Sequence, residues 1–105
     1  MESPYDFDTF INRMAALPYA EILSESEDAV YRAERGTSGV RGAPRKRELG
    51  ALEYSARIKQ FLWFMRTGTR PGSASPEDFS KYRRVVEALV RSGEFKPEAL
   101  TQFGA

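Results

Sequence analysis

Two missing residue types narrow the chemistry that this sequence can support. The 105-residue chain contains neither histidine nor cysteine. It therefore has no imidazole or thiolate to act as a general base, a nucleophile or a transition-metal ligand. Ser-His-Asp and Cys-His catalysis are excluded, and any reaction would have to rely on carboxylates, lysine, tyrosine or a hard cation.

Six basic side chains surround three evenly spaced glycines between residues 32 and 47. The glycines are Gly36, Gly39 and Gly42, and the cations are Arg32, Arg35, Arg41, Arg45, Lys46 and Arg47. A phosphate loop of the nucleotide-enzyme type needs a preceding strand and a Gly-Lys-Ser or Gly-Lys-Thr sequence, and neither is present. Two interpretations stay open: a solvated connection, which we favour, and a basic loop that binds nucleic acid or another polyanion. We expect residues 36–45 to form an exposed loop with few core contacts.

The carboxylates of "SESED", residues 24–28, are the second group with ligand chemistry. Glu25 and Asp28 have half of the paired-carboxylate spacing that a Mg²⁺-dependent nucleotide hydrolase needs, and Glu48 and Glu53 are the acids nearest the next apolar segment. Acidic residues near a helix start are also expected from the helix dipole alone, and this is the interpretation that we favour. We expect no metal and no cofactor.

A third group of charges lies near the C-terminal third of the chain. Helical spacing places Lys81, Arg84 and Arg91 on one outer face, with Arg83 close by. Together with Arg41, Arg45, Lys46 and Arg47 they form a candidate polyanion-binding surface. The alternative, which we favour, is a solvated face carrying the i,i+4 pairs Glu77–Lys81 and Glu87–Arg91.

The run "FLWFM" suggests binding to a protein rather than to an anion. One helical stripe holds Tyr54, Ile58, Phe61, Leu62 and Met65, and the opposite side holds Leu49, Leu52, Ala56 and Trp63. Phe64 falls toward a side with polar neighbours. A helix that is apolar on two faces is either covered on both or binds a partner, so Trp63, Phe64 and Leu52 are candidate partner-binding residues. In a domain this small, a core position for them is the interpretation that we favour.

Four segments of helical period must position these residues. The first has Phe7, Phe10, Ile11, Met14 and Leu17 on one stripe, with Ser3 as N-cap, Pro4 at the first helical position and an end before Pro18. The second is either a single helix or two pieces that meet at Ser24. The Ser24-x-x-Glu27 spacing is that of a capping box, so we favour a short helical turn and then a helix to about Arg35.

The remaining segments have clearer ends. The third helix is expected at about 48–66, and the fourth starts with Ser75 as N-cap and Pro76 at its first position and ends at Gly93. A short helix is expected at about 97–103. Because no segment alternates with period two, we predict an all-α fold: a single-domain bundle, residues 1–105, of four main helices and a short C-terminal helix.

Composition supports a folded protein and leaves three functional hypotheses. The chain is 41% hydrophobic, it has no apolar run long enough for a membrane span, and its start does not resemble a secretory signal. Because cysteine is absent, we expect a cytoplasmic location. Our leading hypothesis is a small non-enzymatic helical module that binds another protein or a second copy of itself as a homo-dimer. A nucleic-acid-binding accessory protein is the alternative, and a carboxylate–Mg²⁺ nucleotide hydrolase is the third.

Overall fold

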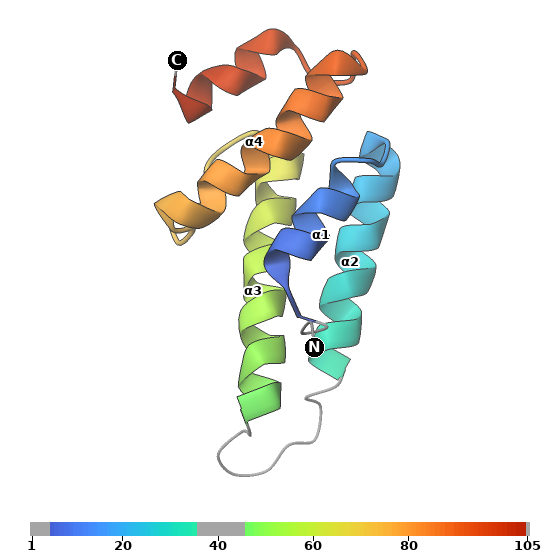
Figure 1. The fold of residues 1–105 in the computed structure, drawn as a ribbon, viewed down its shortest axis with the longest axis vertical. Helices are drawn as coiled ribbons and strands as arrows, with labels where there is room; N and C mark the ends of the chain where they lie inside the picture. The colour runs from blue at the N-terminus through green and yellow to red at the C-terminus, as the bar shows by residue number, and fades with distance from the viewer. Residues whose placement is uncertain (1–4, 36–45, 105) are drawn as a thin grey trace.

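The computed structural model describes residues 5–35 and 46–104, and the side chains of residues 46–48 lie outside that description. The helices are α1 (Phe7–Met14), α2 (Tyr19–Arg35), α3 (Lys46–Thr67), α4 (Pro76–Arg91) and the short 3₁₀ helix η1 (Pro97–Phe103) (Figure 1). No strand occurs in these two ranges. The predicted all-α fold with four main helices and a short C-terminal one is confirmed. The predicted loop at 36–45 lies outside the described residues.

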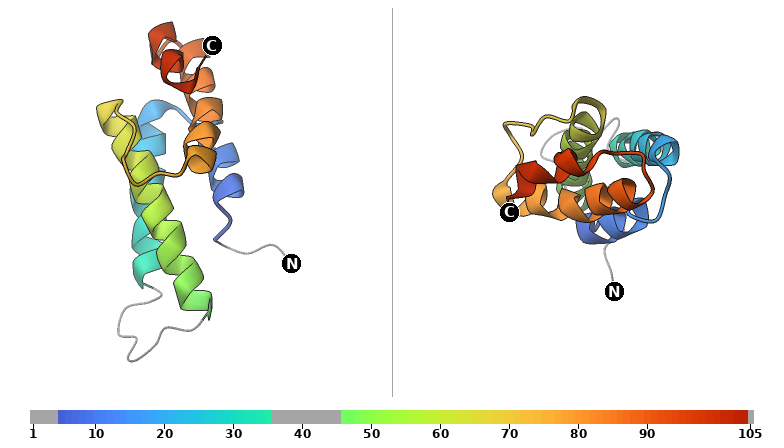
Figure 2. Two further views of the ribbon diagram at one scale, coloured as in Figure 1. Left: turned by 90° about the vertical axis from the view of Figure 1, so that its left-hand side faces the viewer. Right: turned by 90° about the horizontal axis from the view of Figure 1, so that it is seen from above.

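The helices form two layers in a molecule of 47 × 27 × 24 Å. One layer is the α2–α3 hairpin, in which the two longest helices run antiparallel along the long axis (Figure 1). The other layer contains α1 and α4, which lie on one side of the hairpin and contact each other (Figure 2). The helix η1 packs on α4. We call the side of the hairpin that is turned away from α1 and α4 the outer face.

The core fills the space between the two layers and is rich in aromatic rings. Phe61 of α3 makes edge-to-face contacts with Phe10 of α1 and Tyr82 of α4, at centroid distances of 5.6 and 5.3 Å. Phe103 of η1 stacks on Phe79 at 4.7 Å. Such ring pairs stabilise a core beyond the free energy of burying their area. The side chains on the inner side of α3 are therefore part of the core and stabilise the fold.

The ends of α4 form as the sequence predicts. The Oγ of Ser75 accepts a hydrogen bond of 3.1 Å from the backbone N–H of Asp78, and Pro76 is the first helical residue. At the other end Gly93 has φ of 83°, and the N–H of Glu94 donates to the carbonyl of Leu89 at 2.9 Å. This pattern is a Schellman motif, for which glycine is suited because it adopts positive φ without strain.

The predicted start of α1 is wrong. The helix begins at Phe7, and its N-cap is Asp6 rather than Ser3. The Asp6 carboxylate accepts hydrogen bonds from the backbone N–H of Thr9 at 3.3 Å and from its hydroxyl at 2.6 Å. These bonds, the hydroxyl one above all, hold the pKa of Asp6 below its usual value. The helix is thus shorter than expected, and it also ends early, at Met14.

The break at Ser24 that we favoured is also wrong, and the single-helix alternative is confirmed, because α2 is one continuous helix. Its start is stabilised by groups that are distant in sequence. The backbone N–H of Tyr19 donates to the carboxylate of Glu94 at 2.9 Å, and the Tyr19 hydroxyl donates to the carbonyl of Met65 at 2.7 Å. The first bond satisfies a backbone donor at the helix start without a local capping box, and the second ties this end of α2 to α3. Within the described ranges, no helix is long and apolar enough to cross a membrane.

Candidate functional site

The outer face of the hairpin carries large apolar side chains that are open to solvent. Trp63 of α3 is 54% exposed, and Leu49 and Leu52 on the same face of α3 are exposed as well. On α2 the exposed aromatic is Tyr31, at 63%. These four residues are all of the exposed large hydrophobic side chains in the part of the chain that the structure describes. We call them the outer patch.

The position of the outer patch follows from how α3 is covered. On one side α3 packs against α2, and on a second side its aromatic residues contact α1 and α4. The views of the fold place α1 and α4 on the same side of the hairpin, so neither helix covers the outer face (Figure 2). The core position that we favoured for Trp63 is therefore wrong. Neighbouring helices cover α3 only where it meets α2 and where it meets the α1–α4 layer, and Trp63 lies on the remaining, exposed side.

Phe64, another of the predicted partner-binding residues, is buried, in contrast to Trp63. Its side chain is 2% exposed, and its ring contacts Phe79, Tyr82 and Phe103 at centroid distances of 5.4, 5.5 and 5.9 Å. Because successive residues of an α-helix point about 100° apart, the Phe64 side chain points toward α4 while that of the adjacent Trp63 does not. Since the Phe64 ring is enclosed, the core position that we favoured for it is confirmed, and the alternative of a partner-binding role is wrong.

Two ion pairs cross from α2 to α3 beside the outer patch. The Glu27 carboxylate pairs with Arg66, and the Glu34 carboxylate pairs with Lys59. Tyr31 follows Glu27 by four residues and precedes Glu34 by three, and Trp63 stands in the same relation to Lys59 and Arg66. Both aromatics therefore lie between the two pairs on their own helices. In both pairs the acid is on α2 and the base is on α3. The guanidinium of Arg35, which is also on α2, lies 6.0 Å from the centre of the Tyr31 ring.

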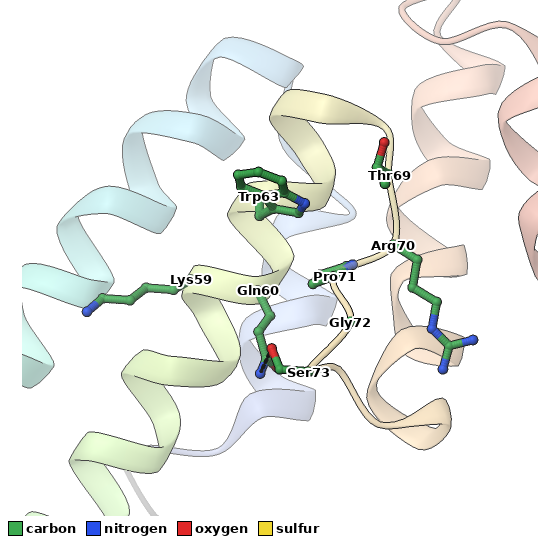
Figure 3. A pocket seen from close by; sticks show the side chains of 8 residues that line it. All are labelled: Lys59, Gln60, Trp63, Thr69, Arg70, Pro71, Gly72 and Ser73. Carbon is green, nitrogen blue, oxygen red and sulfur yellow. Dashed lines mark hydrogen bonds between the residues drawn. The ribbon is translucent and has the colours of Figure 1, made fainter.

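A shallow pocket of about 390 Å³ adjoins Trp63. Its lining residues are Lys59, Gln60, Trp63, Thr69, Arg70, Pro71, Gly72 and Ser73. Figure 3 shows Lys59 extended toward α2 and Arg70 pointing away from Trp63. The guanidinium of Arg70 lies 4.7 Å from the centre of the Phe79 ring. The two cations do not converge, so this pocket offers an indole edge and apolar surface rather than an anion site.

Hydrogen bonds fix the loop that forms the far wall of this pocket. The hydroxyl of Thr67 donates to the carbonyl of Trp63 at 2.8 Å and accepts from the N–H of Thr69 at 3.1 Å. The amide of Gln60 donates to the hydroxyl of Ser73 at 3.0 Å. Trp63 is thus held on a helix beside an ordered loop, which lowers the entropy cost of binding a partner there.

The predicted polyanion surface is not assembled in the residues that the structure describes. Lys81 is only 17% exposed, and its ammonium lies 3.2 Å from Asp8 and 4.0 Å from Asp78. Arg84 donates to the side chain of Asn12 at 2.8 Å, and Arg91 is exposed. The predicted i,i+4 pairs are wrong too: Lys81 pairs with the two aspartates instead, and Glu87 pairs with Arg83 at 2.7 Å.

The basic residues near the glycines are only partly placed. Lys46 and Arg47 lie in the first turn of α3, but their side chains are not described, and Arg41 and Arg45 lie outside the described residues. The start of α3 and the end of α4 lie near opposite ends of the long axis (Figure 1). The two halves of the predicted surface are therefore far apart.

The acidic cluster does not form a metal centre in the described ranges. Glu25 lies 3.5 Å from Arg13, and Glu27 pairs with Arg66. Among residues 5–35 and 46–104, no group of three or more potential ligands converges. The side chain of Glu48 lies outside the described part of the structure.

Sequence reasoning missed Tyr31 and the four charges beside the outer patch. A usable signal was present, because Tyr31 lies opposite the buried stripe of α2 with an acid on either side at helical spacing. A single aromatic on a polar helix face does not by itself indicate a binding site, because isolated exposed apolar residues are common. Comparisons with protein-family models, with curated proteins and with solved structures found no match to this chain.

Proposed function

We propose that this protein is a helical module that binds protein through the outer face of its α2–α3 hairpin. The observation that carries the proposal is the gathering of all four exposed large apolar side chains of the described residues on this one face. Scattered single apolar residues are normal on a protein surface, whereas a gathered set on one face is typical of an interaction site.

The chemistry of the outer patch fits a protein partner. Trp63 and Tyr31 are the residue types that most often contribute the binding energy of an interface, because each has a large apolar ring and one polar atom. The two ion pairs beside them place charge at the rim, where it directs the orientation of a partner more than it adds affinity. Both aromatics are on helices, so their positions are set before binding.

The proposal is tested by replacing the two aromatics and measuring what the protein binds. The outer-face variant combines Tyr31→Ser with Trp63→Ser, and the control combines Arg84→Ser with Arg91→Ser in the other layer. We expect an associated protein, either a second copy or another chain, to bind the wild type and the control but not the outer-face variant. If all three proteins bind it equally, or if the wild type associates with no protein, the proposal is wrong.

The same pair of variants addresses the nucleic-acid alternative, which has less support. Lys81 is engaged by two aspartates, and the remaining cations of α4 are far from the start of α3. Binding through phosphate contacts would weaken steeply with salt and would be reduced in the Arg84→Ser, Arg91→Ser protein. Low-salt titration of the wild type with single- and double-stranded DNA and RNA measures this directly, and we expect no salt-sensitive binding.

A further inference from the structure

We infer that the partner of the outer face is a second copy of this chain, held in a two-fold symmetric dimer with α2 of each copy against α3 of the other. The inference rests on the proposed function and specifies that the protein bound to the outer face is a second copy of the chain. Its basis is the separation of charge across the outer patch together with the antiparallel course of the two helices.

The outer face has an acidic half and a basic half. Beside Tyr31, α2 presents Glu27 and Glu34 together with Arg35, whose guanidinium lies 6.0 Å from the centre of the Tyr31 ring. Beside Trp63, α3 presents Lys59 and Arg66, so the α2 half keeps a net negative charge and the α3 half a positive one. The four charged side chains of the two ion pairs are about half exposed, so each can reach a second molecule as well as its own partner. A surface with this division is complementary to itself in one orientation.

Symmetry allows two simple ways to bring two outer faces together. A two-fold axis parallel to the hairpin places α2 over the partner's α3, so the acids beside Tyr31 face the bases beside the partner's Trp63. An axis across the hairpin places α2 over the partner's α2, so acid faces acid and base faces base. Coulomb repulsion disfavours the second arrangement, and the first one is selected.

The selected arrangement is also a good packing of helices. Because α2 and α3 are antiparallel within one copy, rotation about a parallel axis leaves α2 antiparallel to the partner's α3. The dimer core is then a four-helix bundle in which every neighbouring pair of helices is antiparallel, a common stable architecture. The layers of α1 and α4 lie on the two outside surfaces, where they do not obstruct the contact.

The size of the face sets the expected strength. Two helices about 10 Å apart, with a shared length of about 25 Å, offer on the order of 500 Å² on each copy. The total of about 1,000 Å² is at the low end for a specific complex, so we expect a dissociation constant in the micromolar range rather than a permanent dimer.

Two charge-reversal variants test the arrangement, because each should lose self-association while a mixture of the two should recover it. The first variant carries Lys59→Glu and Arg66→Glu, so both halves of its outer face are acidic. The second carries Glu27→Lys and Glu34→Lys, so both halves are basic. A control for the second variant carries Glu77→Lys and Glu98→Lys, two exposed acids on α4 and η1, with the same change in net charge.

Sedimentation velocity of each protein, alone and in equimolar mixture, gives the result. We expect the wild type and the control to dimerise, each outer-face variant alone to dimerise at least about tenfold more weakly, and the mixture to recover the dimer. Circular dichroism checks that each variant is folded. If either variant does not fold, Trp63→Ser alone replaces the pair, and we expect it to weaken the wild-type dimer by at least about tenfold.

The outcomes separate this inference from the proposed function. A wild type that stays monomeric at millimolar concentration overturns the dimer, and so does a mixture that fails to associate. In either case, binding of a different protein that is lost in the Tyr31→Ser, Trp63→Ser variant would leave the proposed function standing. Dimers that survive in every outer-face variant would overturn both.

Discussion

The inner and outer faces of α3 both carry large apolar side chains, but only the inner face is covered. Phe64 and Trp63 are neighbours in the chain, and their exposed fractions are 2% and 54%. The Phe64 ring is enclosed by three other rings, whereas Trp63 borders an open pocket (Figure 3). What differs between them is the presence of a second layer of helices, not the residue type.

The same contrast holds for the ion pairs. On the inner side, Arg57 forms a two-pronged pair with Asp78, at 3.0 Å from Nε and 2.6 Å from Nη2, and its guanidinium lies 4.5 Å from the centre of the Phe7 ring. The hydrogen bonds to Asp78 raise the pKa of Arg57. On the outer side, Glu27 and Arg66 pair in solvent. The inner face thus stabilises the fold, whereas the outer face is open to solvent.

The largest expected difference is between neighbouring alanine substitutions. Phe64→Ala removes a buried ring and should lower the free energy of unfolding by about 3–5 kcal/mol. Trp63→Ala should change it by no more than about 0.5 kcal/mol, because the indole is exposed. Urea denaturation at low protein concentration measures both without a contribution from association. Equal losses in the two variants would contradict the assignment of the two faces.

A smaller difference is expected between the two kinds of ion pair. Asp78→Ala leaves the half-buried guanidinium of Arg57 without its partner and should cost about 2 kcal/mol, less than for a fully buried pair. Glu27→Ala should cost about 0–0.5 kcal/mol, because its pair with Arg66 is exposed. Thermal unfolding by circular dichroism measures both. A loss for Glu27→Ala as large as that for Asp78→Ala would show that the ion pairs between α2 and α3 on the outer face are needed for folding.

Little or no loss of stability at neutral pH is expected for Tyr82→Phe in the core. The Tyr82 hydroxyl is buried and has no hydrogen-bond partner in the structure, so its removal should leave stability unchanged or raise it by about 1 kcal/mol. Burial also raises the pKa of Tyr82 above its ordinary value of 10. The unfolded chain therefore loses this proton first, and stability should fall as the pH rises above about 10.

The alkaline loss of stability should be smaller in Tyr82→Phe than in the wild type. Unfolding curves at pH values on either side of 10, with tyrosinate absorbance followed in parallel, measure this difference. Identical pH dependence in the two proteins, or ionisation of all five tyrosines with the helical signal intact, would contradict the buried position of Tyr82.

The parts of the fold that depend on local signals were predictable from the sequence. The start and end of α4 follow from Ser75, Pro76 and Gly93, because a cap and a positive-φ glycine act within one turn. The start of α1 was not predictable in the same way, since Ser3 and Asp6 both qualify as caps. In α2, the hydrogen bond from Tyr19 to Glu94 connects groups that are distant in the chain, which local spacing does not reveal.

The candidate site was predictable only in part, for a related reason. Helical period identifies two apolar faces on α3, but it does not say which of them other helices cover. Which face is covered depends on how the two layers of helices pack. Their packing buries Phe64 and leaves Trp63 exposed. The ion pairs from α2 to α3 depend on the register of the hairpin, so Lys59 and Arg66 could not be assigned to the site from spacing alone.

The fluorescence of Trp63, the one tryptophan of the chain, tests the central claim most directly. The emission maximum and acrylamide quenching are measured from about 1 µM to about 1 mM protein. We predict long-wavelength, easily quenched emission at the lowest concentration, and a blue shift with protection from quenching as the protein is concentrated. Blue-shifted, protected emission at every concentration would mean that Trp63 is buried within a single chain, and it would contradict the account.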